Sequence, residues 1–597
     1  MSSKDRKLKG NGSSAGESSS SPSQPKGQRE LIVMAKPEVG LRATHNGVAS
    51  ISGVDVSSLA RLLSSEDVML QPLFGNEDRL QAAASSIAGA ASDEMTDLSV
   101  FYHVQAPDER LDELAKRLLN LPEIEAAYVK PAAELAQTGV RPQTTDVANY
   151  LNQMAPAMED VPPATPNFIA RQGYLNAAPA GIDAYYAWTQ PGGRGTGVRI
   201  IDCEWGWLFT HEDLTLNQGG VVVGTGAADI NHGTAVAGEI SGDVNNVGIT
   251  GIAPDAVFSA AAFSLPTAQV IRAGADRLSA GDIMLLEIHR PGPNANGQGQ
   301  MGFIAVEWWP DDWAAIRYAT NKGVIVVEAA GNGFQNLDDA IYNTPRPGFP
   351  AIWRNPFNRS NAQCGAVMVG AGNPPSGTHG RTQHPNWNEV YVDRARCVFS
   401  NFGACVDAQG WGWEVTSTGY GDLQGGMNNR LHYTDQFSGT SSASPIVVGA
   451  LACVQGVLKA KGRIPLTPAR ARDLLRSTGS PQQAAPGRPA TQRIGNRPNL
   501  RQMIPVVVGA VTPWVGVQFR GTLAAGATQR WFTFNWPAHW HVVWTVVPTT
   551  LRPGSPQIKF NVQVERASDQ FITYWISITN VSPAPCDIEA RYAVLGW

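Results

Sequence analysis

The sequence predicts a multidomain protein built around an α/β domain with a doubly wound parallel sheet, which a small α+β domain precedes and an all-β sandwich follows. Three observations support this: strand-like and helical runs alternate over about residues 170–505, a strand-helix-strand rhythm comes before them, and short alternating strands come after. With 597 residues, the chain is long enough for three or four domains and a large buried core.

The central region predicts the parallel sheet. Apolar, β-branched runs at 198–202, 257–263, 283–288 and 324–327 are typical of buried strands, and 269–278 and 313–320 have helical spacing. Such alternation places helices on both faces of the sheet and functional residues at strand ends and at the following helix starts. Trp308, Trp309 and Trp313 either line a cleft or pack in the core, and the core is the commoner place for clustered rings.

The segment before this domain predicts two successive strand-helix-strand units. Strands are expected at 31–34, 98–104 and 126–129, and the leucines of 56–63 and 111–118 have helical spacing. Residues 31–131 therefore form a small α+β domain. Residues 1–30 are rich in Ser, Gly and Lys and lack the apolar core of a signal peptide, which predicts a disordered tail.

The last segment, residues 506–597, has a third composition. Strand-like runs at 531–534, 542–547, 558–564 and 571–576 are separated by turn signals, which indicates a β-sandwich. Its tryptophans form either a platform for a sugar or polymer or part of a structural core, because alternation turns about half of the side chains inward.

Composition excludes some partners. The chain carries 46 basic and 51 acidic residues, a formal charge of -5, and therefore lacks the broad basic field of nucleic-acid-binding proteins. No uninterrupted apolar stretch reaches the roughly 20 residues that span a bilayer, so no membrane partner is expected. Of the six cysteines, Cys397 and Cys405 are close enough in sequence to form a disulfide, but the scatter of the others favours reduced, packed thiols.

The strongest functional signal is a serine at a helix start. Residues 439–445 read Gly-Thr-Ser-Ser-Ala-Ser-Pro and lead into the apolar helical run 446–457. A hydroxyl at Ser441 would lie beside the unpaired backbone N–H groups of that helix, where donors for an oxyanion are already in place. Read alone, the string is equally compatible with an ordinary Ser/Thr-rich helix cap.

A nucleophilic serine needs a base and an acid that orients the base. Asp202 ends a buried strand, and His232 begins a small-residue helical run. Each is common on its own, as a cap or as a structural histidine, but the order Asp, His, Ser forms a specific set.

Around these residues the chain resembles the subtilisin-like serine proteases, or subtilases, over about residues 170–505. Gly233 and Thr234 follow His232 as in that family, the Gly-Thr-Ser-x-Ala-x-Pro motif is complete at 439–445, and 324–333 resembles the strand that carries the oxyanion-hole asparagine, here Asn332. The resemblance implies a serine endopeptidase that hydrolyses peptide bonds through an acyl-enzyme on Ser441. Asp202, His232 and Ser441 would form the triad, and Asn332 would stabilise the oxyanion.

Two segments depart from the family pattern. After Asp202 the chain reads Cys-Glu-Trp-Gly, where the family has a small residue and then glycine. Residues 282–289 stand in place of the substrate-pairing strand but lack its small residues, which leaves Leu285, Leu286 and Glu287 as candidate substrate-binding residues.

Three alternatives stay open at this point. Sedolisins use a glutamate and an aspartate instead of the histidine, although the His-Gly-Thr run at 232–234 argues against them. Cys203 is a second nucleophilic residue type, but packing of its thiol is favoured, since a neighbouring carboxylate opposes thiolate formation. A noncatalytic binding protein built on a decayed protease core is the rival function, supported by the two departures alone.

The family resemblance also implies a zymogen and adds candidate partners. Residues 31–131 resemble ferredoxin-like propeptides, so we expect a self-processed enzyme whose own N-terminal domain is an intramolecular inhibitor and whose other partners are protein or peptide substrates. The predicted domains are 1–30, 31–131, 132–169, 170–505 and 506–597, where 132–169 is a linker that holds the cleavage site or, alternatively, a passive connection.

The sequence assigns no cofactor and no metal ligand set. Subtilases often contain structural calcium, for which Asp338 and Asp339 are candidates, but two adjacent carboxylates do not make a site. Family resemblance implies secretion, whereas the missing signal-peptide pattern implies the cytoplasm, so the localisation is left open.

Overall fold

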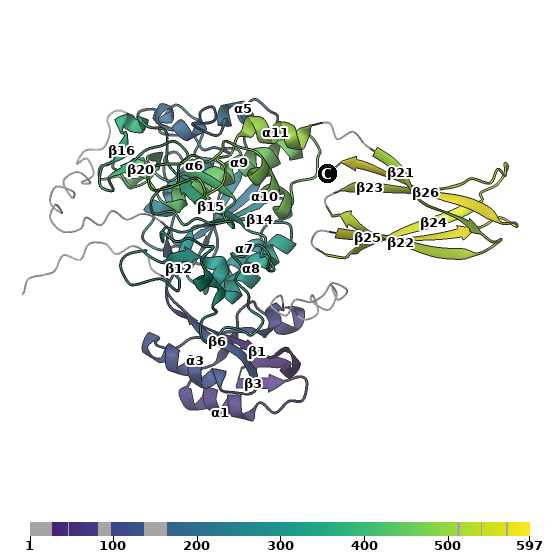
Figure 1. Ribbon diagram of the computed structural model, residues 1–597. Helices are drawn as coiled ribbons and strands as arrows, with labels where there is room; N and C mark the ends of the chain where they lie inside the picture. Colours follow the sequence, from purple (N-terminus) through teal and green to yellow (C-terminus); the bar gives the residue numbers. More distant parts are fainter. Residues whose placement is uncertain are drawn as a thin grey trace, which may run out of the picture.

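The computed structural model describes residues 27–45, 47–80, 97–136, 164–509, 514–538, 540–568 and 571–596. Figure 1 shows an N-terminal lobe, a central α/β domain and a separate β-rich C-terminal lobe. Most of the expected tail 1–30 lies outside the described residues, but Glu30 already belongs to the first strand.

The central domain contains a seven-stranded sheet in which all neighbouring strands run parallel. This confirms the predicted parallel sheet. In spatial order its strands are β18 (Ala408–Trp411), β15 (Val367–Gly372), β14 (Ile325–Ala329), β11 (Ile283–Leu286), β8 (Arg199–Glu204), β10 (Val257–Ala262) and β9 (Gln218–Val223).

Helices cover both faces of this sheet because each strand alternates its apolar side chains between two cores. One core contains residues of α5 (Ala184–Trp188), α6 (Asn231–Ser241), α9 (Thr440–Ala460), α10 (Pro468–Ser477) and α11 (Leu500–Val508). The other contains residues of α7 (Thr267–Ala275) and α8 (Pro310–Asn321). Trp308, Trp309 and Trp313 are buried in the second core, so they do not line a cleft.

Shorter strands lie beside the main sheet. They are the hairpin β19 (Val415–Thr418) and β20 (Tyr433–Phe437), the pair β16 (Gln383–His384) and β17 (Glu389–Val390), and a three-stranded sheet of β13 (Phe303–Ala305), β12 (Ile288–Pro291) and β7 (Glu134–Leu135). Strand β7 precedes the central domain in the chain, yet it pairs with β12 of that domain.

The N-terminal lobe has an antiparallel four-stranded sheet in the order β4 (Leu70–Pro72), β5 (Phe101–Val104), β1 (Glu30–Ala35) and β6 (Ile124–Lys130). Helices α1 (Ser57–Glu66) and α3 (Leu111–Leu119) bury their leucines against this sheet, and β2 (Leu41–Thr44) and β3 (Gly47–Ser50) form a hairpin. The expected strand at 98–104 starts later, at Phe101, because 98–100 form a 3-10 turn capped by Asp97.

The C-terminal lobe is all β, as predicted. One sheet has the order β21 (Trp514–Leu523), β26 (Cys586–Gly596), β23 (His541–Pro548), and the other has the order β22 (Thr528–Pro537), β25 (Phe571–Asn580), β24 (Ile558–Arg566). Both sheets contribute to one core, and Trp536 and Trp544 are part of it. These two indoles are therefore structural.

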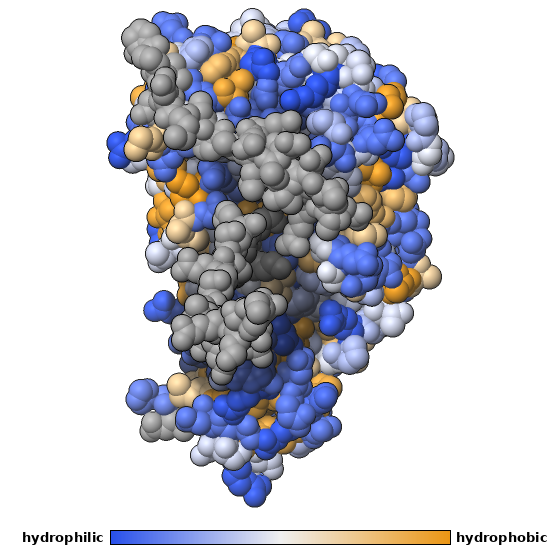
Figure 2. Space-filling view, turned by 90° about the vertical axis from the view of Figure 1, so that its left-hand side faces the viewer, coloured by the Kyte–Doolittle hydropathy of each residue, from blue (hydrophilic) through white to orange (hydrophobic). Residues whose placement is uncertain are grey.

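Helix α9 passes a test of length and hydropathy for crossing a membrane, with 21 residues and a mean hydropathy of 1.6. The expectation that no segment would reach such a length is therefore too simple. The apolar window of α9 is wholly buried, because the helix runs through the core of the central domain beneath the sheet. In Figure 2, the described residues on the visible face are mostly hydrophilic, with scattered hydrophobic ones.

All six cysteines lie in the described part of the chain and are buried free thiols. Cys397 and Cys405 do not form the disulfide that their spacing allows. Cys203 is packed in the core, where burial raises the pKa of its thiol well above the ordinary value and the adjacent Asp202 and Glu204 add to the effect. A thiolate nucleophile at Cys203 is therefore disfavoured.

Candidate active site

Two helix starts and one strand end carry three of the predicted catalytic residues. His232 lies in the first turn of α6, Ser441 lies in the first turn of α9, and Asn332 follows β14. The turn into α9 depends on Gly439, whose φ of 105° is a backbone conformation that favours glycine. The parallel topology thus places all three residues at the carboxyl edge of the sheet.

The acid that contacts the histidine is Glu204. Its Oε2 lies 2.8 Å from His232 Nδ1, and both side chains are buried. The predicted partner, Asp202, accepts a hydrogen bond from Trp207 Nε1 at 2.8 Å instead. The structure thus gives Glu204 the contact with His232 that the sequence analysis expected Asp202 to make.

A signal for this arrangement is present in the sequence. Gly206 stands two residues after Glu204, as the family's glycine stands two residues after its acid, whereas Asp202 is followed by Glu204 at that position. Both acids end β8 and lie two residues apart, so their side chains project from the same face of the strand.

The reacting atoms of Ser441 and His232 are buried. Within the described residues, Ser441 Oγ and His232 Nε2 have no hydrogen-bond partner. Burial lowers the pKa of His232 to about 4. The imidazole is therefore neutral near pH 7, as a general base must be.

A third carboxyl group lies beside the serine. Glu287 Oε1 accepts a hydrogen bond from Ser444 Oγ at 2.7 Å, and Glu287 is fully buried. Burial raises the pKa of Glu287 well above its ordinary value, and the hydrogen bond from Ser444 acts in the opposite direction. Of the three candidate substrate-binding residues, only Glu287 reaches this site, since Leu285 and Leu286 are in the two cores of the main sheet.

A segment of the chain itself occupies the space in front of the serine. The backbone N–H of Ser441 donates to the carbonyl oxygen of Ala136 at 3.2 Å, and the N–H of Ala136 donates to the carbonyl of Glu287 at 3.2 Å. Strand β7, just before Ala136, pairs antiparallel with β12. Main-chain pairing of an extended segment with a sheet edge is a standard mode of peptide binding.

Asn332 and Gln300 complete this arrangement. Asn332 Oδ1 accepts from the N–H and the hydroxyl of Thr440, which fixes the amide with its Nδ2 group on the other side. That Nδ2 donates to Gln300 Oε1 at 3.3 Å, and Gln300 Nε2 donates to the carbonyl of Leu135 at 2.8 Å. The sequence analysis did not identify Gln300, because its loop matches no motif.

The candidates for a metal site do not form a convincing ligand set. Asp338 accepts hydrogen bonds from the backbone N–H of Ala404, and Asp339 accepts one from Asn336 Nδ2. Neither belongs to a group of three ligand side chains in the described part of the chain. Structural calcium stays a prediction without a site.

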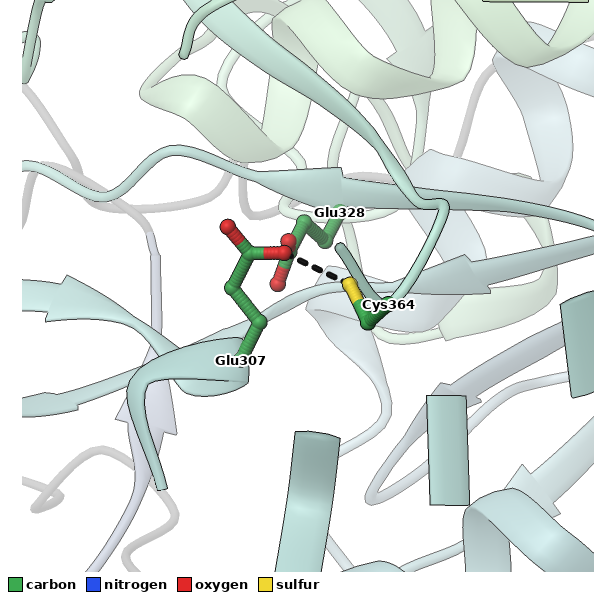
Figure 3. Close-up of side chains that lie close together, drawn as sticks. All are labelled: Glu307, Glu328 and Cys364. Atoms are coloured by element: carbon green, nitrogen blue, oxygen red, sulfur yellow. Dashed lines mark hydrogen bonds between the residues drawn. The ribbon is translucent and has the colours of Figure 1, made fainter. Parts of the chain in front are cut away.

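Another cluster has ligand-type side chains. Figure 3 shows the carboxyl groups of Glu307 and Glu328 and the sulfur of Cys364 pointing toward one another. The Cys364 thiol donates to Glu307 at 2.7 Å, and burial raises the pKa of all three groups. The positive charge of Arg359 acts against this shift at Glu307, because it favours the ionised carboxylate. We assign no metal ion to the cluster, since its thiol already donates to Glu307.

Comparison with known proteins agrees with the geometry. Residues 224–497 match the model of the subtilase family, a range that includes His232, Asn332 and Ser441 but begins after Asp202 and Glu204. Subtilisin BL of Lederbergia lenta is 28% identical over 265 residues, which cover 44% of this chain and 77% of that protein. The thermophilic serine proteinase of Bacillus sp. (strain AK1) is 31% identical over 305 residues, 49% of this chain and 60% of that protein.

Among solved structures, the epidermin leader peptide processing serine protease of Staphylococcus aureus matches over 81% of this chain and its own full length. The TM-score is 0.43 and the identity is 16%, a likeness too distant to bear on function. The chain contains a subtilase domain, which the family match places at residues 224–497 and the curated relatives support. It is a serine-type endopeptidase.

Proposed function

We propose that the protein is made as a zymogen and cleaves its own chain after Ala136. Ser441 is the nucleophile, His232 the general base, and Glu204 the acid that orients His232. Ser441 and Asn332 provide the oxyanion donors. The proposal gives Glu204 the role that the sequence analysis assigned to Asp202, on the basis of the 2.8 Å contact with His232 Nδ1.

The proposed reaction gives each of these residues one role. His232 Nε2 takes the proton of Ser441 as the hydroxyl attacks the carbonyl carbon of Ala136, and the negative charge that forms on the oxygen is met by the Ser441 N–H and the Asn332 amide. The bond between residues 136 and 137 breaks, and His232 gives its proton to the leaving nitrogen. Water then hydrolyses the acyl-enzyme by the same steps in reverse order.

One observation carries the proposal: the carbonyl oxygen of Ala136 lies 3.2 Å from the backbone nitrogen of Ser441, while the N–H of Ala136 donates to the carbonyl oxygen of Glu287. A peptide bound this way presents the Ala136 carbonyl to the nucleophile and to the donors of the oxyanion hole. The cleavage site then falls in the expected linker 132–169, of which residues 137–163 lie outside the described part of the chain.

The N-terminal domain, residues 31–131, is proposed as the inhibitor that stays in place after cleavage. A buried network of charges supports this role. Lys130 of β6 contacts Asp311 at 2.6 Å and Asp312 at 2.8 Å, and both carboxylates open helix α8 of the catalytic domain. Arg290 of β12 contacts Glu30 of β1 at 2.7 Å.

The opposite charges of this network stabilise one another. Although burial opposes it, Lys130 and Arg290 keep the pKa of Glu30 below its ordinary value. Separating the domains would expose these charges or leave them buried without a partner. The network therefore favours the closed complex only while every partner is present. Within the proposed organisation, 170–505 is the catalytic domain and 506–597 is a structural β-sandwich.

The test compares the full-length protein with Ser441→Ala. We expect the parent protein to lose an N-terminal fragment that ends at Ala136 by intact mass, and the processed enzyme to react with a fluorophosphonate probe once the fragment is removed. The Ser441→Ala protein should do neither. The proposal would be overturned if the parent protein does not cleave itself and also fails to react with the probe after an added protease has removed the N-terminal domain.

A further inference from the structure

Two carboxyl groups, not one, stand behind His232. Asp202 Oδ2 accepts from Trp207 Nε1, and Glu204 Oε2 contacts His232 Nδ1. The other oxygens, Asp202 Oδ1 and Glu204 Oε1, are fully buried and have no donor within the described residues. The two side chains lie two residues apart and project from the same face of β8, so a hydrogen bond between their carboxyl groups is within reach. Two ionised carboxylates are acceptors only, so such a bond requires a proton.

The surroundings favour keeping that proton. The charged groups that act on the pair are Glu287, from the end of β11, Asp229, from the loop before α6, and His232 itself. Two of these three are acidic, and Asp202 and Glu204 are both buried to within about 1% of full burial. A second negative charge here would face like charges in a buried site, which is strongly unfavourable.

The hydrogen-bond pattern decides which residue carries the proton. Glu204 faces the imidazole, which becomes positively charged during the reaction, so ionisation is favoured on Glu204. Asp202 Oδ2 accepts from the indole N–H of Trp207, so the proton would lie on Asp202 Oδ1 and be donated to Glu204 Oε1.

We propose that Asp202 is a positioning residue that stays protonated and donates its hydrogen to Glu204, so that the pair holds His232 with a single negative charge. The inference rests on the proposed function of Ser441, His232 and Glu204. It also predicts that His232 is a weaker base than it would be beside Glu204 alone, because the hydrogen bond from Asp202 takes up part of the negative charge of Glu204.

The test uses the fact that an asparagine has the same hydrogen-bond pattern as a protonated aspartic acid. In Asp202→Asn, the amide oxygen can accept from Trp207 and the amide nitrogen can donate to Glu204. We expect kcat/KM on a peptide substrate to stay within about tenfold of the parent. Glu204→Gln should lose on the order of 10⁴-fold, the cost of replacing the orienting acid of a serine protease triad by its amide.

The pH profile of kcat/KM supplies a readout that a merely structural role would not move. The parent should lose activity at alkaline pH when the shared proton leaves, and Asp202→Asn should remove this limb without moving the acid limb. Asp202→Ala, which leaves Glu204 without its donor, should shift the acid limb to higher pH because the carboxylate then holds the imidazolium more strongly.

The reverse result would overturn the inference: a loss near 10⁴-fold in Asp202→Asn with activity kept in Glu204→Gln would make Asp202 the orienting acid. If Asp202→Asn does not fold, Trp207→Phe provides the second test. It removes a donor that stabilises ionised Asp202, so the alkaline limb should move to higher pH, and a shift to lower pH counts against the shared proton. Failure of the proposed function is distinct, since the parent would then not react with the fluorophosphonate probe at all.

Discussion

The backbone N–H of Ser441 points at the carbonyl oxygen of Ala136 over 3.2 Å, although the two residues are 305 positions apart in the chain. Ala136 and Leu135 are almost completely buried in this position. The contact therefore specifies both a cleavage position and a demand for a small side chain where Ala136 lies.

The first prediction concerns that position. Ala136→Trp should slow self-processing by 100-fold or more, because an indole added to a fully buried alanine must displace packed neighbours. The rate is measured by following intact mass after refolding. Glu134→Ala is the matched control, since Glu134 lies one residue before Leu135 and is only partly buried. This substitution should change the rate little. Normal processing of the tryptophan variant would place the cleavage elsewhere.

The oxyanion donors give a second prediction. Asn332→Ala should lower kcat on a peptide substrate about 10²- to 10³-fold with little change in KM, which is the loss of kcat caused by removing one oxyanion-hole donor in subtilisin. Gln300→Ala is the contrasting variant, because Gln300 contacts the backbone of Leu135 and not the reacting carbonyl. It should raise KM more than it lowers kcat, and equal effects of both variants on kcat would argue against this division of roles.

Much of this site follows from the sequence, but the choice of acid does not. The serine and histidine motifs locate helix starts, and a parallel sheet brings helix starts and strand ends to one edge, so His232, Asn332 and Ser441 are predictable. Asp202 and Glu204 both end β8 on the same face, and only side-chain length and the position of α6 decide which one reaches the imidazole. The spacing to Gly206 was the available signal.

The seating of Ala136 was beyond sequence reasoning for a different reason. It depends on β7 pairing with β12 and on the N-terminal lobe docking on α8, which are contacts between segments more than 150 residues apart. A low-complexity linker carries no local pattern for such pairing, so the sequence could place the cleavage site only within 132–169.

A third prediction concerns the interface between the inhibitor and the enzyme. Lys130→Met should weaken binding of the cleaved N-terminal domain by at least 100-fold, because Asp311 would remain buried without its cation and Asp312 would keep only Arg290, at 3.5 Å. Removing one member of a buried charge network costs about 3–5 kcal/mol. Inhibition of the processed enzyme by added N-terminal domain measures the effect.

The control for this variant is Arg29→Ala. Arg29 pairs with Asp108 at the surface of the same N-terminal lobe, where both partners are partly or largely exposed. Exposed ion pairs contribute about 0–1 kcal/mol, so inhibition should be nearly unchanged. If Lys130→Met inhibits as well as the parent domain, the buried network does not hold the complex together.

The last prediction is that the folded protein loses stability as the pH rises above about 6.5. Burial raises the pKa of Asp202, Glu239, Glu287 and Glu328 well above their ordinary values. The folded state therefore keeps protons that the unfolded chain releases above about pH 4.5, and the free energy of unfolding falls with rising pH wherever the folded state binds more protons.

Buried histidines act in the opposite direction, but only at lower pH. Burial lowers the pKa values of His211, His232 and His384 to about 4, so the unfolded chain binds more protons only below about pH 6.5. Above that pH the carboxyl groups determine the slope, and toward pH 9 the buried thiols, whose pKa burial also raises, add to it in the same direction. A melting temperature measured from pH 6.5 to 9 in the Ser441→Ala background, where self-digestion is absent, should therefore fall steadily.

Glu239→Gln isolates one of these carboxyl groups. Glu239 is fully buried on α6, and both of its oxygens lack a donor within the described residues, so an amide of the same shape removes the proton equilibrium with little change in packing. Each fully retained proton contributes about 1.4 kcal/mol per pH unit. The variant should match its parent near pH 5 and exceed it increasingly at alkaline pH, whereas Glu109→Gln, on the exposed surface of the N-terminal lobe, should follow the parent. A difference between Glu239→Gln and its parent that does not change with pH would show that Glu239 is ionised in the folded protein.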